Sequence, residues 1–355
     1  MEIVENKILL SICIPTFNRA ELLRPLVEEC LSIKSDEIEV VVSDNCSTDN
    51  TEKRMRAFND DRFRYHRNSE NIGWENIGLC IMRGHGKFCL LLRDKDSIPN
   101  IKQWFKSVKP VLKKNDGTSI FYGRLIAANG DWIIRVPKSQ KRNTPAIYTS
   151  IINGPPLATS IIFPRKLLDT FYKIPQKLST YLWSIYPHIC LALYCAKYCD
   201  MVAMKSLTVK MRVSNVFKDP KAAVGAGGIY PYWFMESRIN QMLDMVRLFQ
   251  GLELPSEILE PIMIKLINRS NVLSCYGYAM LFQSGNNGIK EVERAREKPI
   301  SYWNFIYWNG YKSILEKITE LYNLTLLHPQ TFDNAMDWYL RLADVTTLKE
   351  ISQSK

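Results

Sequence analysis

The chain has 355 residues, of which 46% are hydrophobic and 23% are charged. This composition excludes a disordered protein and provides more core than one small domain needs, so we expect a catalytic domain with an appendage. The formal net charge of +11 favours an anionic partner: a nucleotide diphosphate, a nucleic acid or an anionic membrane surface.

Short apolar strands and amphipathic helices alternate over the first hundred residues. Such alternation is typical of βαβ units around a mostly parallel, Rossmann-like sheet, so an α/β fold is expected. Ligands of these sheets lie beyond the carboxyl ends of the strands, which makes the residues that follow each strand informative. The patterns predict strands at 9–14, 38–43, 63–66 and 88–92, and helices at 21–33, 50–58 and 74–84.

The pattern changes after Thr118, where an Asn-Gly turn signal at Asn129 and Gly130 joins two predicted strands. A glycine-rich break at 225–228 precedes a run of helical patterns. We therefore expect a catalytic domain over 1–225 and a helical domain over 226–355. The elements predicted here are strands at 120–126, 132–136, 160–163 and 202–213, and helices at 164–172, 187–199, 233–252, 257–280, 288–297 and 311–322.

An acidic cluster, Asp94-Lys95-Asp96, follows the apolar strand at 88–92. Two carboxylates separated by one residue can share a hard divalent cation such as Mg²⁺ or Mn²⁺. That cation would neutralise a nucleotide diphosphate as a leaving group. The pattern alone is common by chance, and its place at a strand end makes it informative. The sequence thus predicts a metal site at Asp94 and Asp96.

The loop after the first strand carries Thr16, which can donate a hydrogen bond, and Arg19, which can pair with phosphate. The same segment has the spacing of a capping box, with Asn18 as the N-cap and Glu21 as the third helical residue. Phosphate binding and helix capping are both compatible with this pattern.

The loop after the second strand begins with Asp44, whose carboxylate can accept a hydrogen bond from a base imide or amine. Ligand binding is the favoured interpretation for Asp44. A structural turn is favoured for 47–50, and Asp49 is a candidate N-cap of the next helix.

These loops together resemble glycosyltransferase family 2, whose fold is GT-A. Four segments in the family's order carry the resemblance, and they read SICIPTFNRAELL, EVVVSDNCSTDNT, NSENIGW and GHGKFCLLLRDKD. Three later segments more loosely resemble the abequosyltransferase-like O-antigen enzymes, and they read NGPPLATSIIFPRKLL, STYLWSIYPHICLAL and VKMRVSNVF. The resemblance implies a GT-A catalytic domain that binds a nucleotide sugar.

The resemblance also implies roles for individual residues. Asp44 would read the base, and Asp96 would be the main metal ligand, with Asp94 assisting it or touching the ribose. The chain departs from the family at Lys95, which replaces one of two adjacent acids and would itself contact phosphate. The other matched positions along the nucleotide are Pro15, Thr16, Arg19, Asn71 and Gly73.

The catalytic base carries the weakest signal. The family usually has a Glu-Asp pair beyond the metal motif, where this chain has Tyr186-Pro187-His188. Pro187 suits a first helical turn, and the helix dipole would keep His188 neutral, as a general base requires. A packed histidine is the alternative, and Asp169 is a second candidate base.

Arg212 lies at the end of the extended segment 202–213, and Asn215 follows it. Both residues would close over the diphosphate; a solvated arginine is the alternative for Arg212. The predicted activity is the metal-assisted, inverting transfer of a sugar from a UDP, CDP, dTDP or GDP donor. The predicted acceptor is a glycan or a polyprenyl-diphosphate-linked sugar in bacterial surface polysaccharide synthesis, such as O-antigen or capsule.

Three alternatives were weighed against this function. A degenerate, non-catalytic sugar-nucleotide binder stays open because of Lys95 and the missing Glu-Asp pair. A nucleotidyltransferase would need a glycine-rich phosphate loop after the first strand, and a nucleic-acid-binding protein would need clustered basic residues. Nine cysteines without a CxxC pair, and no signal-peptide pattern, favour a cytoplasmic protein. Core packing is the favoured interpretation of the C-terminal aromatic residues, and peripheral association at the inner membrane face, together with scattered lysines, is the alternative.

Overall fold

The computed structural model describes residues 7–73, 75–126, 130, 132–134, 138–153, 159–171, 187–212, 243, 247, 250–255, 257–262 and 264. The chain divides into two compact units, one of residues 1–216 with 226–228 and one of 217–225 with 229–355. The boundary predicted at Gly225 and most of the helices predicted after it lie outside the described residues, so the helical domain stays a prediction.

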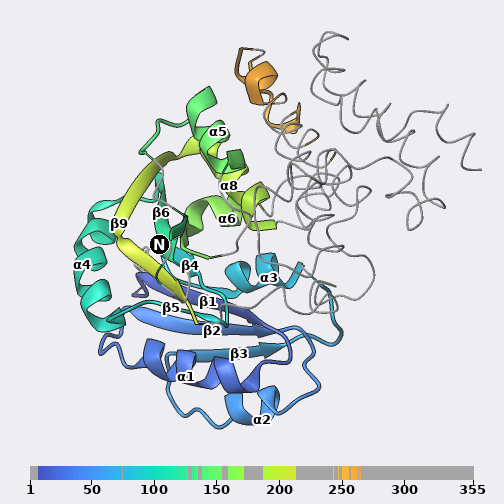
Figure 1. Cartoon of the computed structure of the whole chain (residues 1–355), viewed down its shortest axis with the longest axis vertical. Coiled ribbons are helices and arrows are strands. Elements are labelled where there is room, and N and C mark those ends of the chain that lie inside the picture. Colours follow the sequence, from blue (N-terminus) through green and yellow to red (C-terminus); the bar gives the residue numbers. More distant parts are fainter. Residues whose placement is uncertain are drawn as a thin grey trace, which may run out of the picture. The chain divides into compact units, whose positions relative to one another are not determined.

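The first half of the sheet is parallel and follows the predicted alternation (Figure 1). Its strands are β1 (Leu10–Thr16), β2 (Ile38–Asp44), β3 (Phe63–Arg67) and β4 (Phe88–Leu91). β1 lies in the middle and pairs with β2 on one side and β4 on the other. Every residue of β2 is buried, as the β-branched run of this strand predicts. The carboxyl ends of β1, β2 and β4 therefore meet at one edge.

Helices α1 (Ala20–Leu31), α2 (Thr51–Met55) and α3 (Glu75–Arg83) follow the first three strands. α1 buries one apolar stripe, which includes Leu23, Leu26 and Val27, against the core. α2 ends at Met55 and is shorter than predicted.

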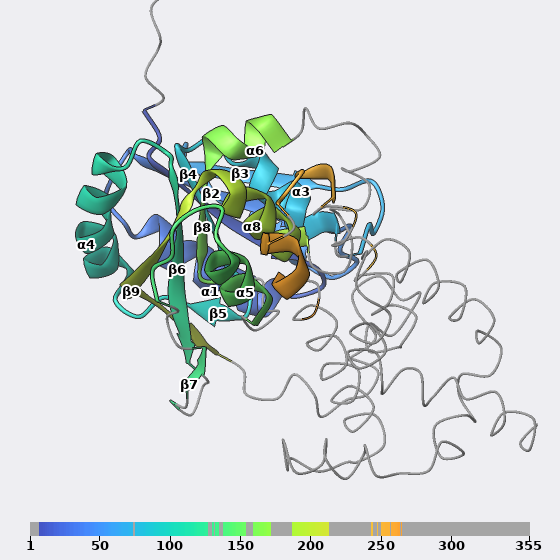
Figure 2. The same cartoon turned by 90° about the horizontal axis from the view of Figure 1, so that it is seen from above.

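The second half of the sheet is mixed. It contains β8 (Ile161–Pro164), β6 (Ser119–Ile126), β9 (Asp200–Met211), β5 (Asp96–Ser97) and β7 (Trp132–Ile134). The nine strands run in the order β3-β2-β1-β4-β8-β6-β9-β5, with β7 paired to β6 (Figure 2). β4 and β8 are antiparallel, as are β6 and β8, so the sheet is less parallel than the alternation predicted.

β9 is one long strand that pairs with β6 in two stretches. The register shifts between Tyr122 and Arg124, at Gly123. A Cβ on Gly123 would lie 2.4 Å from the Leu207 Cγ and 2.4 Å from the Leu207 carbonyl oxygen. Only glycine therefore allows β9 to cross β6 this closely.

The structure contains two helices that we did not predict, α4 (Ile101–Lys114) and α5 (Pro145–Asn153). α4 has an apolar stripe at helical spacing, which Ile101, Trp104 and Phe105 begin, and all three are buried. Pro110 argues locally against a helix there, and packing of the stripe on the core overrides it. Helices α6 (Arg165–Phe171) and α8 (Pro187–Tyr198) are found where predicted. None of the described helices is long and apolar enough to cross a membrane.

Candidate active site

The loops that follow β1, β2 and β4 are hydrogen-bonded to one another. The Asn45 N–H donates to the Thr16 carbonyl at 2.9 Å. The Thr16 hydroxyl donates to the Asp94 Oδ2 at 2.9 Å, and the Asn18 N–H donates to the Ser47 hydroxyl at 2.9 Å. The sequence-predicted donor-site residues thus converge at the carboxyl edge of the parallel strands, where α/β sheets bind ligands.

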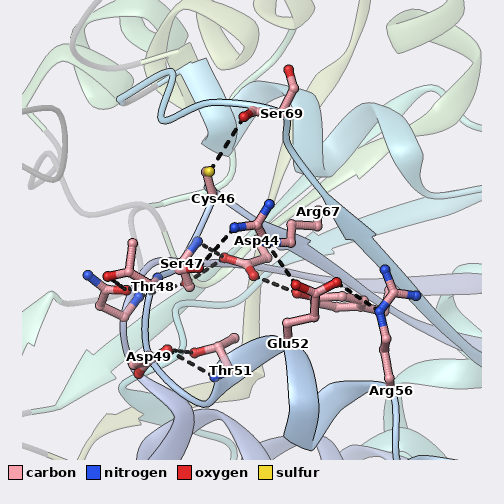
Figure 3. Close-up of polar contacts among 12 residues, drawn as sticks. Asp44, Cys46, Ser47, Thr48, Asp49, Thr51, Glu52, Arg56, Arg67 and Ser69 are labelled. Atoms are coloured by element: carbon pink, nitrogen blue, oxygen red, sulfur yellow. Dashed lines mark hydrogen bonds and ion pairs between the residues drawn. The ribbon is translucent and has the colours of Figure 1, made fainter.

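Asp44 is fully buried at the end of β2 (Figure 3). Its Oδ1 accepts the Ser47 N–H at 3.0 Å and the Ser47 hydroxyl at 2.5 Å, and its Oδ2 accepts the Tyr65 hydroxyl at 2.5 Å. Burial and the hydrogen bond to Asp44 raise the pKa of Tyr65, so this phenol remains a donor. In this arrangement Asp44 orders the loop at 45–50, and contact with a base requires that loop to shift.

Arg67, the last residue of β3, binds the same loop (Figure 3). Its Nη2 donates to the Ser47 carbonyl at 3.1 Å, and its Nε lies 3.2 Å from the Glu52 Oε2. Glu52 also pairs with Arg56, at 2.9 Å. These contacts connect β3, α2 and the loop beside Asp44.

Asn45 holds the next predicted pair, Asn71 and Gly73, beside Asp44. Its Nδ2 donates to the Asn71 Oδ1 at 2.6 Å and to the Gly73 carbonyl at 3.1 Å. Its Oδ1 accepts the Ile72 N–H at 2.9 Å. Gly73 has a φ of 61°, a left-handed conformation that glycine adopts without strain.

The predicted capping box at Asn18 and Glu21 is wrong. α1 has Arg19 at its N-cap with no side-chain cap bond, and Asn18 is left-handed, with a φ of 52°. The Asn18 Oδ1 instead accepts the Thr48 N–H at 2.7 Å. The Ala20 N–H at the start of α1 is satisfied by the Asp49 Oδ2 at 3.1 Å.

Asp49 also acts on the following helix, although the N-cap of α2 is Asn50 and not Asp49 as predicted. Its Oδ1 accepts the Thr51 N–H at 2.9 Å and the Thr51 hydroxyl at 2.5 Å. One carboxylate therefore serves the N-termini of α1 and α2, where a negative charge is favourable.

Asp96 is fully buried and its carboxylate is paired with Arg93. The Arg93 Nε lies 2.7 Å from Oδ2, and Nη2 lies 2.9 Å from Oδ1. This two-pronged contact is the arrangement a guanidinium prefers with a carboxylate. We did not predict the pair from sequence, although Arg93 stands three residues before Asp96.

Asp94 faces the first loop. Its Oδ2 accepts the Thr16 hydroxyl and lies 3.6 Å from the Arg19 Nε, and the Arg19 side chain is 42% exposed. Burial raises the pKa of Asp94, against the opposing effects of Arg19 and Thr16. Asp94 thereby connects the acidic cluster to the residues expected along the nucleotide.

Lys95 lies between the two aspartates and is only 9% exposed. Burial, and then the charges of Arg93 and Arg19, lower the pKa of Lys95 to about 8. Asp94 and Asp96 act in the opposite direction. Within the part of the chain that the structure describes, the Lys95 ammonium makes no hydrogen bond and no ion pair.

The predicted metal ligands do not fit a divalent ion as they are arranged. Both oxygens of Asp96 are held by Arg93, and one oxygen of Asp94 is held by Thr16. Among the described residues, no three His, Cys, Asp or Glu side chains are grouped so that they could hold a metal. The charge of Lys95, which interacts with both carboxylates, also opposes a second cation there.

The backbone of the acidic loop is anchored by the end of β9. Asp96 pairs with Met211, and the Arg212 N–H donates to the Lys95 carbonyl at 2.9 Å. The Arg212 guanidinium forms an ion pair with Glu29 of α1. The structure therefore brings Arg212 to the site through its backbone, while its side chain is engaged away from the loop.

His188 lies in the first turn of α8 and is 1% exposed. Burial, followed by the charge of Arg93, lowers the pKa of His188 to about 3. The imidazole is therefore neutral at physiological pH, and it is a weak proton acceptor in this arrangement. Asn215 and the side chain of Asp169 lie outside the described residues.

The mixed sheet, with loops gathered at the carboxyl ends of β1, β2 and β4, is that of a GT-A fold. A solved structure of Staphylococcus aureus TarS 1-349, in complex with UDP-GlcNAc, supports this class with a TM-score of 0.54. It is 16% identical in sequence, and the match covers 87% of this chain and 89% of that chain.

The family follows from the sequence of the same region. Residues 11–169 match the sequence model of Glycosyl transferase family 2, so this segment is similar to the domain of that family. The curated abequosyltransferase RfbV of Salmonella typhimurium (strain LT2) is 36% identical over 99 residues. That match covers 25% of this chain and 29% of RfbV, so it spans less than a third of that relative's length.

Proposed function

We propose that this protein transfers a sugar from a nucleotide-diphosphate sugar to a hydroxyl acceptor. The observation that carries the proposal is the cluster of Thr16, Arg19 and Asp94, which joins the loops after β1 and β4 at the donor edge of a family 2 domain. The exposed part of Arg19 offers a guanidinium to a diphosphate. The TarS fragment solved with UDP-GlcNAc agrees with this donor class, and the name of RfbV, an abequosyltransferase, agrees with sugar transfer.

The reaction we propose is direct displacement with inversion. The acceptor oxygen bonds to the anomeric carbon, the bond from that carbon to the diphosphate oxygen breaks, and a base takes the hydroxyl proton. Asp44 reads the base once the loop at 45–50 shifts, and Asp94 contacts the ribose. His188 is the proposed base, although a pKa of about 3 requires that substrate binding first change its surroundings.

The acceptor and the cellular role are proposals that rest on the partial similarity to RfbV. We propose a glycan or polyprenyl-diphosphate-linked acceptor in O-antigen or capsule synthesis, at the inner face of the cell membrane. The Mn²⁺ or Mg²⁺ predicted from the sequence would be held by Asp94 and Asp96. Since these carboxylates do not fit the ion as arranged, no step is assigned to it.

A thermal-shift panel of UDP, CDP, dTDP and GDP tests the proposed donor site. A ligand that binds only the native state stabilises it by about 2.7 kcal/mol at a hundred times its Kd, so one nucleotide should raise the melting temperature. Arg19→Met should lose most of this shift. Arg24→Met, which removes an exposed guanidinium paired with Glu28, should retain it. No shift with any nucleotide would contradict the proposal.

A second candidate is a non-catalytic binder of sugar nucleotides. The full pairing of Asp96 with Arg93 and the low pKa of His188 favour it. Hydrolysis or transfer of the sugar from the matching nucleotide sugar distinguishes the two. Binding without any turnover, in the presence of acceptor lipids and glycans, supports the binder.

A further inference from the structure

Lys95 lies at the donor edge, and no described residue pairs with its charge. The residue is 9% exposed, and its ammonium forms no hydrogen bond or ion pair with the described residues. A lysine that is largely shielded from water is normally paired, because an unpaired charge away from water is unfavourable. The exception points to a partner outside the described residues, and a bound anion is such a partner.

The surroundings of Lys95 carry an excess of positive charge. Three cations, namely Arg19, Arg93 and Lys95, face two carboxylates, Asp94 and Asp96. Arg93 is committed to Asp96, and Arg19 lies 3.6 Å from Asp94. One positive charge therefore remains, and it belongs to the side chain without a partner. An anion fits this place better than a metal ion.

The backbone keeps this charge in position. The Lys95 carbonyl accepts the Arg212 N–H at 2.9 Å, and the Asp96 N–H donates to the Arg93 carbonyl at 3.0 Å. β5 ties the next residues to β9. The backbone of the loop is therefore held on both sides of Lys95, and the ammonium is close enough to Arg19 for their charges to interact.

We propose that the Lys95 ammonium replaces a divalent ion and neutralises the diphosphate of the donor, so that the nucleotide binds without metal. The proposal rests on the proposed function, since it names how the same site holds its leaving group. Lys95 donates to a phosphate oxygen, and Arg19 provides the second cation from the exposed side. In the transfer step the electron pair of the broken sugar–oxygen bond stays on a diphosphate that Lys95 stabilises.

Calorimetric titration of the full chain with inorganic pyrophosphate, and with the four nucleoside diphosphates, tests this in EDTA and in Mn²⁺. Pyrophosphate reports on the diphosphate subsite whatever the base. Wild-type protein should bind in EDTA with an affinity within about threefold of that in Mn²⁺. Loss of a charge-assisted hydrogen bond is worth roughly 10- to 100-fold in affinity, so Lys95→Met should show this loss in EDTA.

Two further variants separate charge from fold. Lys95→Arg keeps the charge and should restore affinity to within about tenfold of wild type, because a guanidinium also pairs with phosphate. Lys106→Met removes an exposed lysine of α4 and should leave binding unchanged. Circular dichroism melting shows whether each variant is folded. If Lys95→Met does not fold, the comparison of wild type in EDTA and Mn²⁺ still decides the outcome.

The outcomes are distinguishable. Binding that requires Mn²⁺ in the wild type overturns the inference and leaves the proposed function in place, with the predicted metal site as its explanation. Equal affinity of wild type and folded Lys95→Met in EDTA also overturns it. Absence of binding by every probe, with or without metal, overturns both the inference and the proposed function.

Discussion

Asp44, Asp96 and Glu39 are carboxylates that the fold buries beside hydrogen-bond donors or cations. Asp44 accepts three hydrogen bonds, and both oxygens of Asp96 are bound by Arg93. Glu39 accepts the Ser11 hydroxyl at 2.6 Å and lies 2.7 Å from the Arg64 Nε. Buried charges are tolerated only with such partners, so each of these residues orders the chain around it.

At the residue scale, Asp44→Asn should destabilise the protein. The two oxygens of Asp44 both face donors, and an amide nitrogen in either place would leave a donor unpaired. The free energy of unfolding should fall by about 1–3 kcal/mol in urea titrations, and Tyr65→Phe, which removes one donor, by about 0.5–1.5 kcal/mol. A change of less than about 0.5 kcal/mol for Asp44→Asn, the range of surface substitutions, would contradict the description of this site.

The lowered pKa of Glu39 predicts that the stability of the protein depends on pH. Burial alone would raise the pKa of Glu39, but the hydrogen bonds from Ser11 and the His85 N–H, and the charges of His85 and Arg64, lower it below the ordinary 4.5. A lowered folded pKa contributes stability above the unfolded pKa and loses it as the pH falls through the folded value. The stability difference between wild type and Glu39→Gln should therefore be largest near neutral pH and shrink below 4.5.

Chemical unfolding between pH 7 and pH 3 measures this difference. Glu70→Gln, at an exposed position, is the control and should follow the wild-type profile. A Glu39→Gln profile parallel to wild type throughout would show that the carboxylate is not paired in solution.

At the scale of elements, the site depends on how β9 crosses β6 and reaches β5. The two stretches of pairing, on either side of Gly123, bend the long strand so that Met211 reaches Asp96. A straight β9 paired in one register would not deliver Arg212 to the Lys95 carbonyl. The irregularity in the ladder is therefore a feature that builds the site.

Gly123→Ala should weaken both the fold and the site. The new methyl group would lie 2.4 Å from Leu207 atoms, one of them a backbone oxygen that cannot move independently. We expect a loss of about 1–3 kcal/mol in unfolding free energy, the usual effect of overpacking. Ser206→Ala, at an exposed position of the same strand, should have little effect. Equal midpoints of unfolding for the two variants would contradict the close crossing.

At the scale of the whole molecule, strands from both halves of the first unit pair in one sheet and together form the donor edge. β4 pairs with β8 and β5 pairs with β9, so residues after 160 support loops that precede residue 97. The first unit is therefore the smallest part of the chain that contains every described residue of the site.

Limited digestion with trypsin should first cut between the two compact units. Lys218 and Lys221 lie at this junction, and cleavage there would release a fragment that retains all nine strands. Lys102 and Lys106 provide the control, because α4 holds them in a helix that resists cleavage. Mass spectrometry identifies the first products. A first cut within α4 would contradict the division into these units.

The sequence by itself determined the elements of the parallel half and the location of the acidic cluster. β-branched runs and helical spacing are local signals, so β1 to β4 and α1 to α3 are found within a few residues of their predicted bounds. The family resemblance, which implied a GT-A fold, is confirmed by the match over 11–169.

Only the tertiary structure decided how the charges of the site are paired. Thr16 meets Asp94 across 78 positions, and Tyr65 meets Asp44 across 21, so no local pattern reports these contacts. Asn18 has the composition of a cap, but its φ and its bond to Thr48 are set by the neighbouring loop. The sequence places Lys95 between two aspartates. Only the structure shows that no described residue pairs with Lys95, because Arg93 binds both oxygens of Asp96 and one guanidinium can saturate one carboxylate.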